Sequence, residues 1–172
     1  MRRNYHGFSL IELLVVVAIA GILATVAGAS IAGQIQQQNL GLAQQNVLQA
    51  IRNTRQLAIS KSRFFTIDFL TSSTAPIRIY DGSDWATATI QQSQILPDNI
   101  NMKINGVGPF STTFNFRGEI PNAGQLRTIY LTRNTDTTIY PNSDAGRAAC
   151  AAASTCKAVV ISTVLGKVRT IQ

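Results

Sequence analysis

Few residues of this chain are suited to catalysis. The single histidine, His6, lies among the first seven residues, so the commonest general base is absent from the rest of the sequence. Gly106 and Gly108 are followed by Pro109 and a predicted strand, whereas a phosphate-binding glycine loop opens a helix. The later acidic residues show no spacing typical of a catalytic pair: Asp68, Asp81, Asp84, Asp98, Glu119, Asp136 and Asp144. We predict no catalytic residues, no cofactor and no enzymatic activity.

Two cysteines near the C-terminal end, Cys150 and Cys156, enclose the short segment "CAAASTC". A disulfide, two free thiols and a metal-binding pair are the alternatives. A metal site is disfavoured, because there is no further cysteine and the only histidine is far away in the sequence. If this part of the chain lies outside the cytoplasm, we expect a disulfide, which would stabilise the fold by roughly 2–3 kcal/mol.

The last predicted strand carries two basic residues. Its side chains alternate between two faces, with Lys167, Arg169 and Ile171 on one and Val168 and Thr170 on the other. We expect Val168 to face the core, which leaves Lys167 and Arg169 on the outer face, roughly 6.6 Å apart. The net charge of +7 permits an acidic partner such as nucleic acid or anionic lipid. An edge strand protected by charges is the alternative interpretation.

The N-terminal stretch "HGFSLIELLVVVAIAGILA" looks like the start of a membrane span. Arg2 and Arg3 precede it, and the uncharged segment Leu13–Gly33 would form a helix of roughly 31 Å, about one hydrocarbon core. The positive residues predict a cytoplasmic N-terminus. A cleaved signal peptide ending at Ala27–Ala29 and an uncleaved anchor both fit this segment. Neither explains the acid Glu12, although a charge near the edge of a span is tolerated.

The segment "GFSLIELLVVVAIAGILA" resembles the class III signal of type IV pilins and type II secretion pseudopilins. The resemblance implies that a prepilin peptidase cleaves between Gly7 and Phe8 and that Phe8 is then N-methylated. His6 would leave with the leader. Glu12 would become the fifth residue of the mature chain, which is the acidic position of the family. Its carboxylate would neutralise the α-amine of a neighbouring subunit, since an unpaired buried charge is very costly.

A long helix and then a series of short strands are predicted after the leader. No proline occurs from residue 8 to residue 75, so one helix is expected to run from about Ser9 to about Ser60, apolar all round at first and then amphipathic. Its core-facing residues recur at helical spacing: Leu40, Ala43, Val47, Ala50, Ile51 and Leu57. Predicted strands cover 64–70, 77–80, 85–90, 100–104, 110–117, 126–132, 158–163 and 167–172, with "DGSD", "NGVGP", "GEIPNAG" and "PNSDAG" as turns.

These elements predict an α+β fold, in which a long N-terminal helix packs on a C-terminal antiparallel β-sheet domain. Given the resemblance, this is the pilin fold. The expected divisions are a leader (1–7), a transmembrane and assembly helix (8–33), an amphipathic half of the helix (34–63) and a β-rich globular domain (64–172).

The order of elements resembles GspH/FimT-type minor pilins in particular, with "FNFRGEI" (Phe114–Ile120) and "VVISTVLGKVR" (Val159–Arg169) as the similar segments. FimT-like DNA-uptake pilins carry a glycine–arginine–any–arginine motif at the second place, where this chain has "GKVR". Lys167 binds phosphate as a point charge and lacks the bidentate fork of arginine. The resemblance implies DNA binding by Lys167 and Arg169, without sequence specificity. Further candidates for this surface are Arg127, Arg133, Arg147 and Lys157.

We therefore expect a minor pilin that is inserted once in the bacterial inner membrane, with its N-terminus cytoplasmic. Prepilin peptidase would process it, and it would join other pilins or pseudopilins in an extracellular or periplasmic filament and bind DNA for uptake. One alternative is a type II secretion pseudopilin of the GspH type without DNA binding. Another is a membrane-anchored extracytoplasmic binding domain that does not polymerise.

Overall fold

The computed structural model describes residues 9–71, 75–83, 88–104, 110–121, 127–162 and 167–171, with the side chains of 25–32, 162 and 167 left out. Two compact units are present, 1–35 and 36–172, and both contain part of one helix. The predicted membrane segment, 8–33, includes Phe8 and the side chains of 25–32, which lie outside the described residues. Within the described part of the chain, no helix combines the length and apolar character needed to cross a membrane.

Helix α1 (Leu10–Lys61) is a single α-helix of 52 residues, which confirms the predicted helix of about Ser9–Ser60. It ends at Ser62, whose positive φ of 51° breaks the helical path. Five of the predicted core residues are buried: Leu40, Ala43, Val47, Ala50 and Ile51. Leu57 lies at the edge of this buried stripe, and the neighbouring Ala58 takes the fully buried position.

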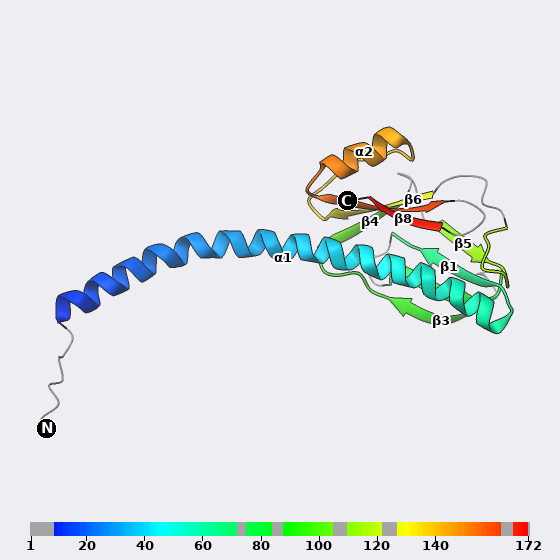
Figure 1. The fold of residues 1–172 in the computed structure, drawn as a ribbon, viewed down its shortest axis with the longest axis horizontal. Helices are drawn as coiled ribbons and strands as arrows, with labels where there is room; N and C mark the ends of the chain where they lie inside the picture. Colours follow the sequence, from blue (N-terminus) through cyan, green and yellow to red (C-terminus); the bar gives the residue numbers. More distant parts are fainter. Residues whose placement is uncertain are drawn as a thin grey trace, which may run out of the picture. The chain divides into compact units, whose positions relative to one another are not determined.

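The strands form two antiparallel sheets of four strands each, whereas the sequence had suggested one sheet (Figure 1). The first sheet has the order β3 (Thr89–Gln94), β2 (Ile77–Asp81), β1 (Phe65–Phe69) and β5 (Phe110–Phe114). The second has the order β4 (Ile100–Ile104), β6 (Arg127–Arg133), β7 (Cys156–Ser162) and β8 (Lys167–Ile171). Most strands lie within two residues of their predicted bounds, but β3 begins four residues later and β5 ends three residues earlier.

One hydrophobic core joins α1 to both sheets. The first sheet contributes Phe65, Ile67 and Phe69 from β1, and the second contributes side chains such as Ile129 and Val159. These residues alternate along their strands with side chains on the opposite face, as period-two patterning requires. The stripe of α1 that begins at Leu40 therefore belongs to the same core as the inner faces of both sheets.

A second helix, α2 (Asp144–Ala152), occupies a segment that the sequence analysis had assigned to the turn "PNSDAG" and the loop after it. That assignment was wrong. The Ser143 side chain accepts a hydrogen bond from the Gly146 N–H at 3.2 Å and so caps the helix, and an alanine-rich run continues it. Gly146 lies against the backbone oxygen of Pro141, where a side chain would collide. In Figure 1, α2 lies beside the second sheet, on the side away from α1.

Candidate nucleic-acid interface

Strand β8 is the edge strand of the second sheet, and its side chains alternate as predicted. Val168 packs on the main core, while Ile171 packs on a smaller cluster that lies on the other face. Arg169 belongs to the same outer face as Ile171 and is exposed to solvent. The backbone of Lys167 pairs with Ser162 of β7, and its side chain lies outside the described residues.

Arg169 lies in a row of residues that crosses the outer face of the second sheet. It pairs with Val160 of β7, which pairs in turn with Thr128 of β6. Arg147 of α2 approaches the far end of this row, where its Nη1 donates to the Thr128 hydroxyl at 3.4 Å. The fold thus brings Arg147 and Arg169, which are 22 residues apart in the sequence, to the same face.

Arg147 is held by internal contacts. Its Nη2 donates to the carboxylate of Asp144 at 2.5 Å, and only 14% of its side chain is exposed. Asp144 also lies in the first turn of α2, where an acid interacts favourably with the helix dipole. Arg147 therefore stabilises α2 on the sheet and offers little free charge, whereas Arg169 has its guanidinium in solvent.

Arg127 lies on the opposite face of the same sheet. It pairs with Ile161, which points into the main core, and its guanidinium carbon lies 4.5 Å from the centre of the Phe110 ring. Because Ile161 also pairs with Val168, Arg127 is at the end of the sheet where β8 begins. It is exposed and close to that end, but it points away from the outer face that carries Arg169.

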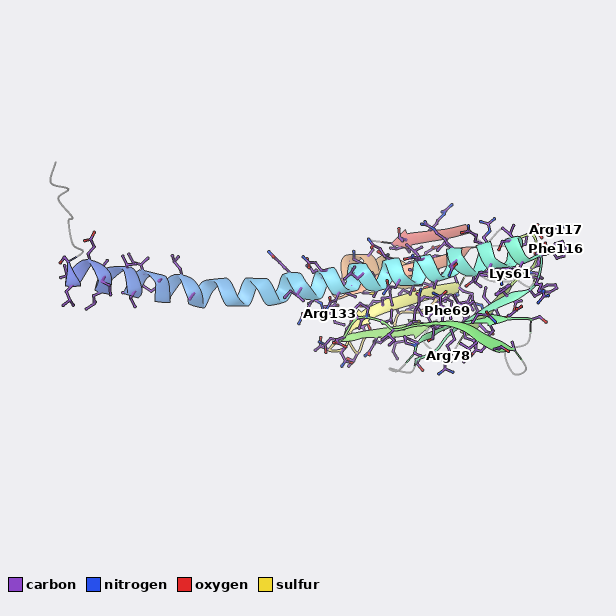
Figure 2. All side chains as sticks on the ribbon, turned by 90° about the horizontal axis from the view of Figure 1, so that it is seen from below. Lys61, Phe69, Arg78, Phe116, Arg117 and Arg133 are labelled. Carbon is purple, nitrogen blue, oxygen red and sulfur yellow. A yellow bond between two sulfur atoms is a disulfide. The ribbon has the colours of Figure 1, made fainter. Side chains whose placement is uncertain are left out.

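The other two candidates, Arg133 and Lys157, lie at the opposite end of the sheet. Arg133 is the last residue of β6 and lines a cavity of about 280 Å³ with Gln36 and Asn39 of α1. Lys157 is the second residue of β7 and lines a different hollow, next to Leu40. Figure 2 shows Arg133 far along α1 from Lys61. These two residues do not join the surface of Arg169.

A polar network around Asp136 stabilises the segments that pack on the outer face. Thr155 and Tyr140 donate to the Asp136 carboxylate at 2.8 and 3.0 Å, and the Thr138 backbone N–H donates to it at 2.9 Å. Burial alone would raise the pKa of Asp136, but these hydrogen bonds outweigh it and hold the pKa below its ordinary value of 3.8.

Cys150 of α2 and Cys156 of β7 form a disulfide, as predicted, with 5.2 Å between their Cα atoms. The bond ties the end of α2 to the start of β7. Both cysteines belong to the smaller cluster on the outer face, together with Tyr130 and Tyr140, whose rings stack at 5.3 Å between centres. A covalently closed unit therefore packs on the same outer face that carries Arg169.

The residues predicted for processing and assembly lie at the N-terminal end. Gly7 and Phe8 are outside the described residues. Glu12 occupies the first turn of α1, where its N–H donates to the Ser9 carbonyl at 3.0 Å and its side chain is exposed. Among the described residues, no three His, Cys, Asp or Glu side chains lie close enough to hold a metal ion.

The sequence analysis did not identify Phe116 and Arg117 as surface residues of interest, although both belong to the quoted "FNFRGEI". The structure places them in a tight turn after β5, next to the end of α1 (Figure 2). The available signal was an aromatic and a basic residue together in a turn.

Comparisons with known proteins support both the N-terminal motif and the fold. The family model described as the prokaryotic N-terminal methylation motif matches residues 2–28. The fold is similar to a crystal structure of the type IV minor pilin FimU from Pseudomonas aeruginosa, with a TM-score of 0.56 and 16% identity over 77% of this chain and 87% of that chain. A second crystal form of FimU gives a TM-score of 0.51 and 16% identity over 76% and 91%. No curated protein sequence matches the chain. The chain thus combines a prokaryotic N-terminal methylation motif in residues 2–28 with a fold similar to that of a type IV minor pilin.

Proposed function

We propose that this pilin is a minor subunit of a type IV pilus-like filament and that it binds DNA through the outer face of β8. The observation that supports DNA binding is the exposed Arg169 on an edge strand, two residues after Lys167. Arg169 has no carboxylate partner among the described residues. Its guanidinium is therefore available to a phosphate, with which it forms bidentate hydrogen bonds.

Such a surface contacts the phosphate backbone through its positive charges. Binding by a few cations releases the counterions of DNA, so affinity falls steeply as the salt concentration rises and depends little on base sequence. An edge strand suits this role, because β8 has a neighbouring strand on one side only among the described residues, and a long polymer can lie along its free side. The subunit would thus capture DNA for uptake without regard to its sequence.

The N-terminal segment directs assembly of the subunit into the filament. In this proposal, prepilin peptidase cleaves between Gly7 and Phe8, Phe8 is N-methylated, and residues 8–33 hold the subunit in the inner membrane until it joins other pilins. The exposed carboxylate of Glu12 then pairs with the α-amine of a neighbouring subunit. Residues 34–63 form the amphipathic half of the helix and pack on the globular domain, 64–172, which lies outside the membrane.

Binding of a labelled duplex to the full chain in detergent tests the DNA-binding site. Replacing Lys167 and Arg169 together by Ala should weaken binding and reduce the slope of log affinity against log salt by about 2, because two phosphate contacts are lost. The control is Arg133→Ala with Lys157→Ala, which removes the same charge from the other end of the sheet. An unchanged affinity and salt slope in the first variant would reject the site and favour a GspH-type subunit without DNA binding.

Mass spectrometry of the mature N-terminus tests the assembly proposal independently. A chain that begins with methylated Phe8 is expected. Any other N-terminus would reject cleavage after Gly7. A processed chain that never enters filaments would instead indicate a membrane-anchored binding domain.

A further inference from the structure

A second surface of the domain combines exposed aromatic rings with positive charge. It lies where α1 ends, and we call it the tip patch. Its members are Arg55, Ile59, Lys61, Phe64, Phe116 and Arg117. Phe116 is 49% exposed and Phe64 is 42% exposed, which is unusual for the largest apolar side chains. Figure 2 shows Lys61, Phe116 and Arg117 together at this end of the domain.

The turn that follows β5 fixes the positions of Phe116 and Arg117. The side-chain oxygen of Asn115 accepts hydrogen bonds from the backbone N–H groups of Arg117 and Glu119, both at 2.9 Å. Gly118 donates its N–H to the Asn115 carbonyl at 2.8 Å and has a φ of 73°, a conformation that favours glycine. The two exposed side chains are thus held on a closed turn.

Strand pairing and helix contacts bring the members of the tip patch together. Phe65 pairs with Phe114, so Phe64 and Phe116 both extend from the same end of the β1–β5 pair. A side chain at Gly118 would come within 2.7 Å of Ile59 and 2.9 Å of the Arg55 Nε, which shows how closely the turn packs on the last turns of α1.

The charge of this surface is positive. Arg117 places its guanidinium carbon 5.5 Å from the centre of the Phe116 ring. Neither Arg55 nor Lys61 pairs with a carboxylate among the residues that the structure describes, although the Arg55 Nε itself is buried without a hydrogen-bond partner. Two acids lie nearby, and each has a partner. Asp81 lies 3.8 Å from Arg63, and Glu119 accepts from the Asn115 side chain at 3.1 Å.

We propose that the tip patch binds single-stranded nucleic acid. Bases stack on the exposed rings of Phe116 and Phe64, and the phosphates between them contact Lys61, Arg117 and Arg55. Exposed aromatic rings beside unpaired cations suit this ligand, because every base has a flat apolar face and every nucleotide carries a negative charge. A duplex keeps its bases stacked inside, so it would gain only the charge contacts. The tip patch is therefore distinct from the β8 surface, which offers charge without aromatic rings.

Fluorescence anisotropy with the full chain in detergent tests this inference. The ligands are a labelled oligothymidylate of about 15 nucleotides and a duplex of the same length. Phe116→Ala should weaken binding of the single strand by roughly fivefold or more, because one stacking contact is lost, while duplex binding changes little. Phe116→Trp should retain single-strand binding. Ile139→Ala, which removes an exposed apolar side chain from another surface, is the matched control.

The results separate this inference from the β8 proposal. Replacing Lys167 and Arg169 together by Ala should weaken binding of the duplex. The effect of Phe116→Ala on single-strand affinity should be the same in that background. The inference is overturned if Phe116→Ala and Phe64→Ala both bind the single strand like the unmodified chain. It is equally overturned if these variants lose filament assembly at unchanged single-strand affinity, which would identify the tip patch as a contact between subunits.

Discussion

Gln44 donates its side-chain amide to the carbonyl oxygen of Ala158 at 3.0 Å, across 114 residues of sequence. The same amide reaches the carbonyl of Ile171 at 3.2 Å. Gln44 lies on α1 and is 6% exposed, while Ala158 and Ile171 belong to β7 and β8. A buried polar side chain thus links the helix to the edge strand that carries Arg169, and this contact helps to hold the proposed DNA-binding surface in place.

Replacing Gln44 should therefore loosen the C-terminal edge of the second sheet. Gln44→Leu keeps a similar volume but leaves two carbonyl oxygens without this donor, so we expect the free energy of unfolding to fall by about 1–3 kcal/mol. Urea unfolding followed by circular dichroism measures this change. Gln45→Leu, at the exposed neighbouring position, is the control and should have little effect. Equal stability of the two variants would contradict the role of Gln44.

The lowered pKa of Asp136 should make the stability of the fold depend on pH. Its pKa is lowered in the folded state by the hydrogen bonds it accepts, so it stabilises the fold above its unfolded pKa of 3.8. This stabilisation is lost as the pH falls through the lower, folded pKa. Asp136→Asn should cost about 1–2 kcal/mol at pH 7, because Thr155 and Tyr140 lose a charged acceptor.

The difference between Asp136→Asn and the unmodified chain should shrink as the pH is lowered below about 4. Thermal unfolding at several pH values measures it. Asp98→Asn, which removes an exposed carboxylate, is the control and should cost little stability at pH 7. A cost of Asp136→Asn that stays the same at pH 7 and pH 3 would show that the charge of Asp136 is not responsible.

The disulfide between Cys150 and Cys156 should contribute to stability. Replacing both cysteines by serine should lower the free energy of unfolding by roughly 2–3 kcal/mol, since the short loop is no longer closed in the unfolded chain. A thiol reductant should lower the melting temperature of the unmodified chain and leave that of the double variant unchanged. The prediction fails if labelling with maleimide before reduction finds two free thiols.

The long helix and most strands could be predicted because their signals are local. The buried stripe of α1 follows from spacing along one helix, and the outward direction of Arg169 follows from alternation along one strand. The division into two sheets could not be predicted in this way. It depends on which strands pair, and β1 pairs with β5 while β4 pairs with β6. The residue pattern within one strand does not indicate which other strand it pairs with.

The surface around Arg169 was predictable only in part for the same reason. Arg127 and Arg147 are close to β8 in space but lie on opposite faces, because one is on the inner side of β6 and the other is on α2. The helix α2 itself was missed, since its capping serine and the short alanine run were interpreted as turn residues. Closeness along the sequence therefore does not fix which of these residues share the face of Arg169.

The stripe of α1 that packs in the core also determines which fragments of the chain can keep the fold. Because residues from Leu40 to Ala58 complete the core of both sheets, a fragment that starts at the first strand would expose the inner faces of each. A fragment that begins at Gln36 keeps the whole stripe. Limited proteolysis should accordingly release a stable domain only by cleavage on the N-terminal side of Leu40, and soluble fragments for crystallography or binding assays have to include this part of the helix.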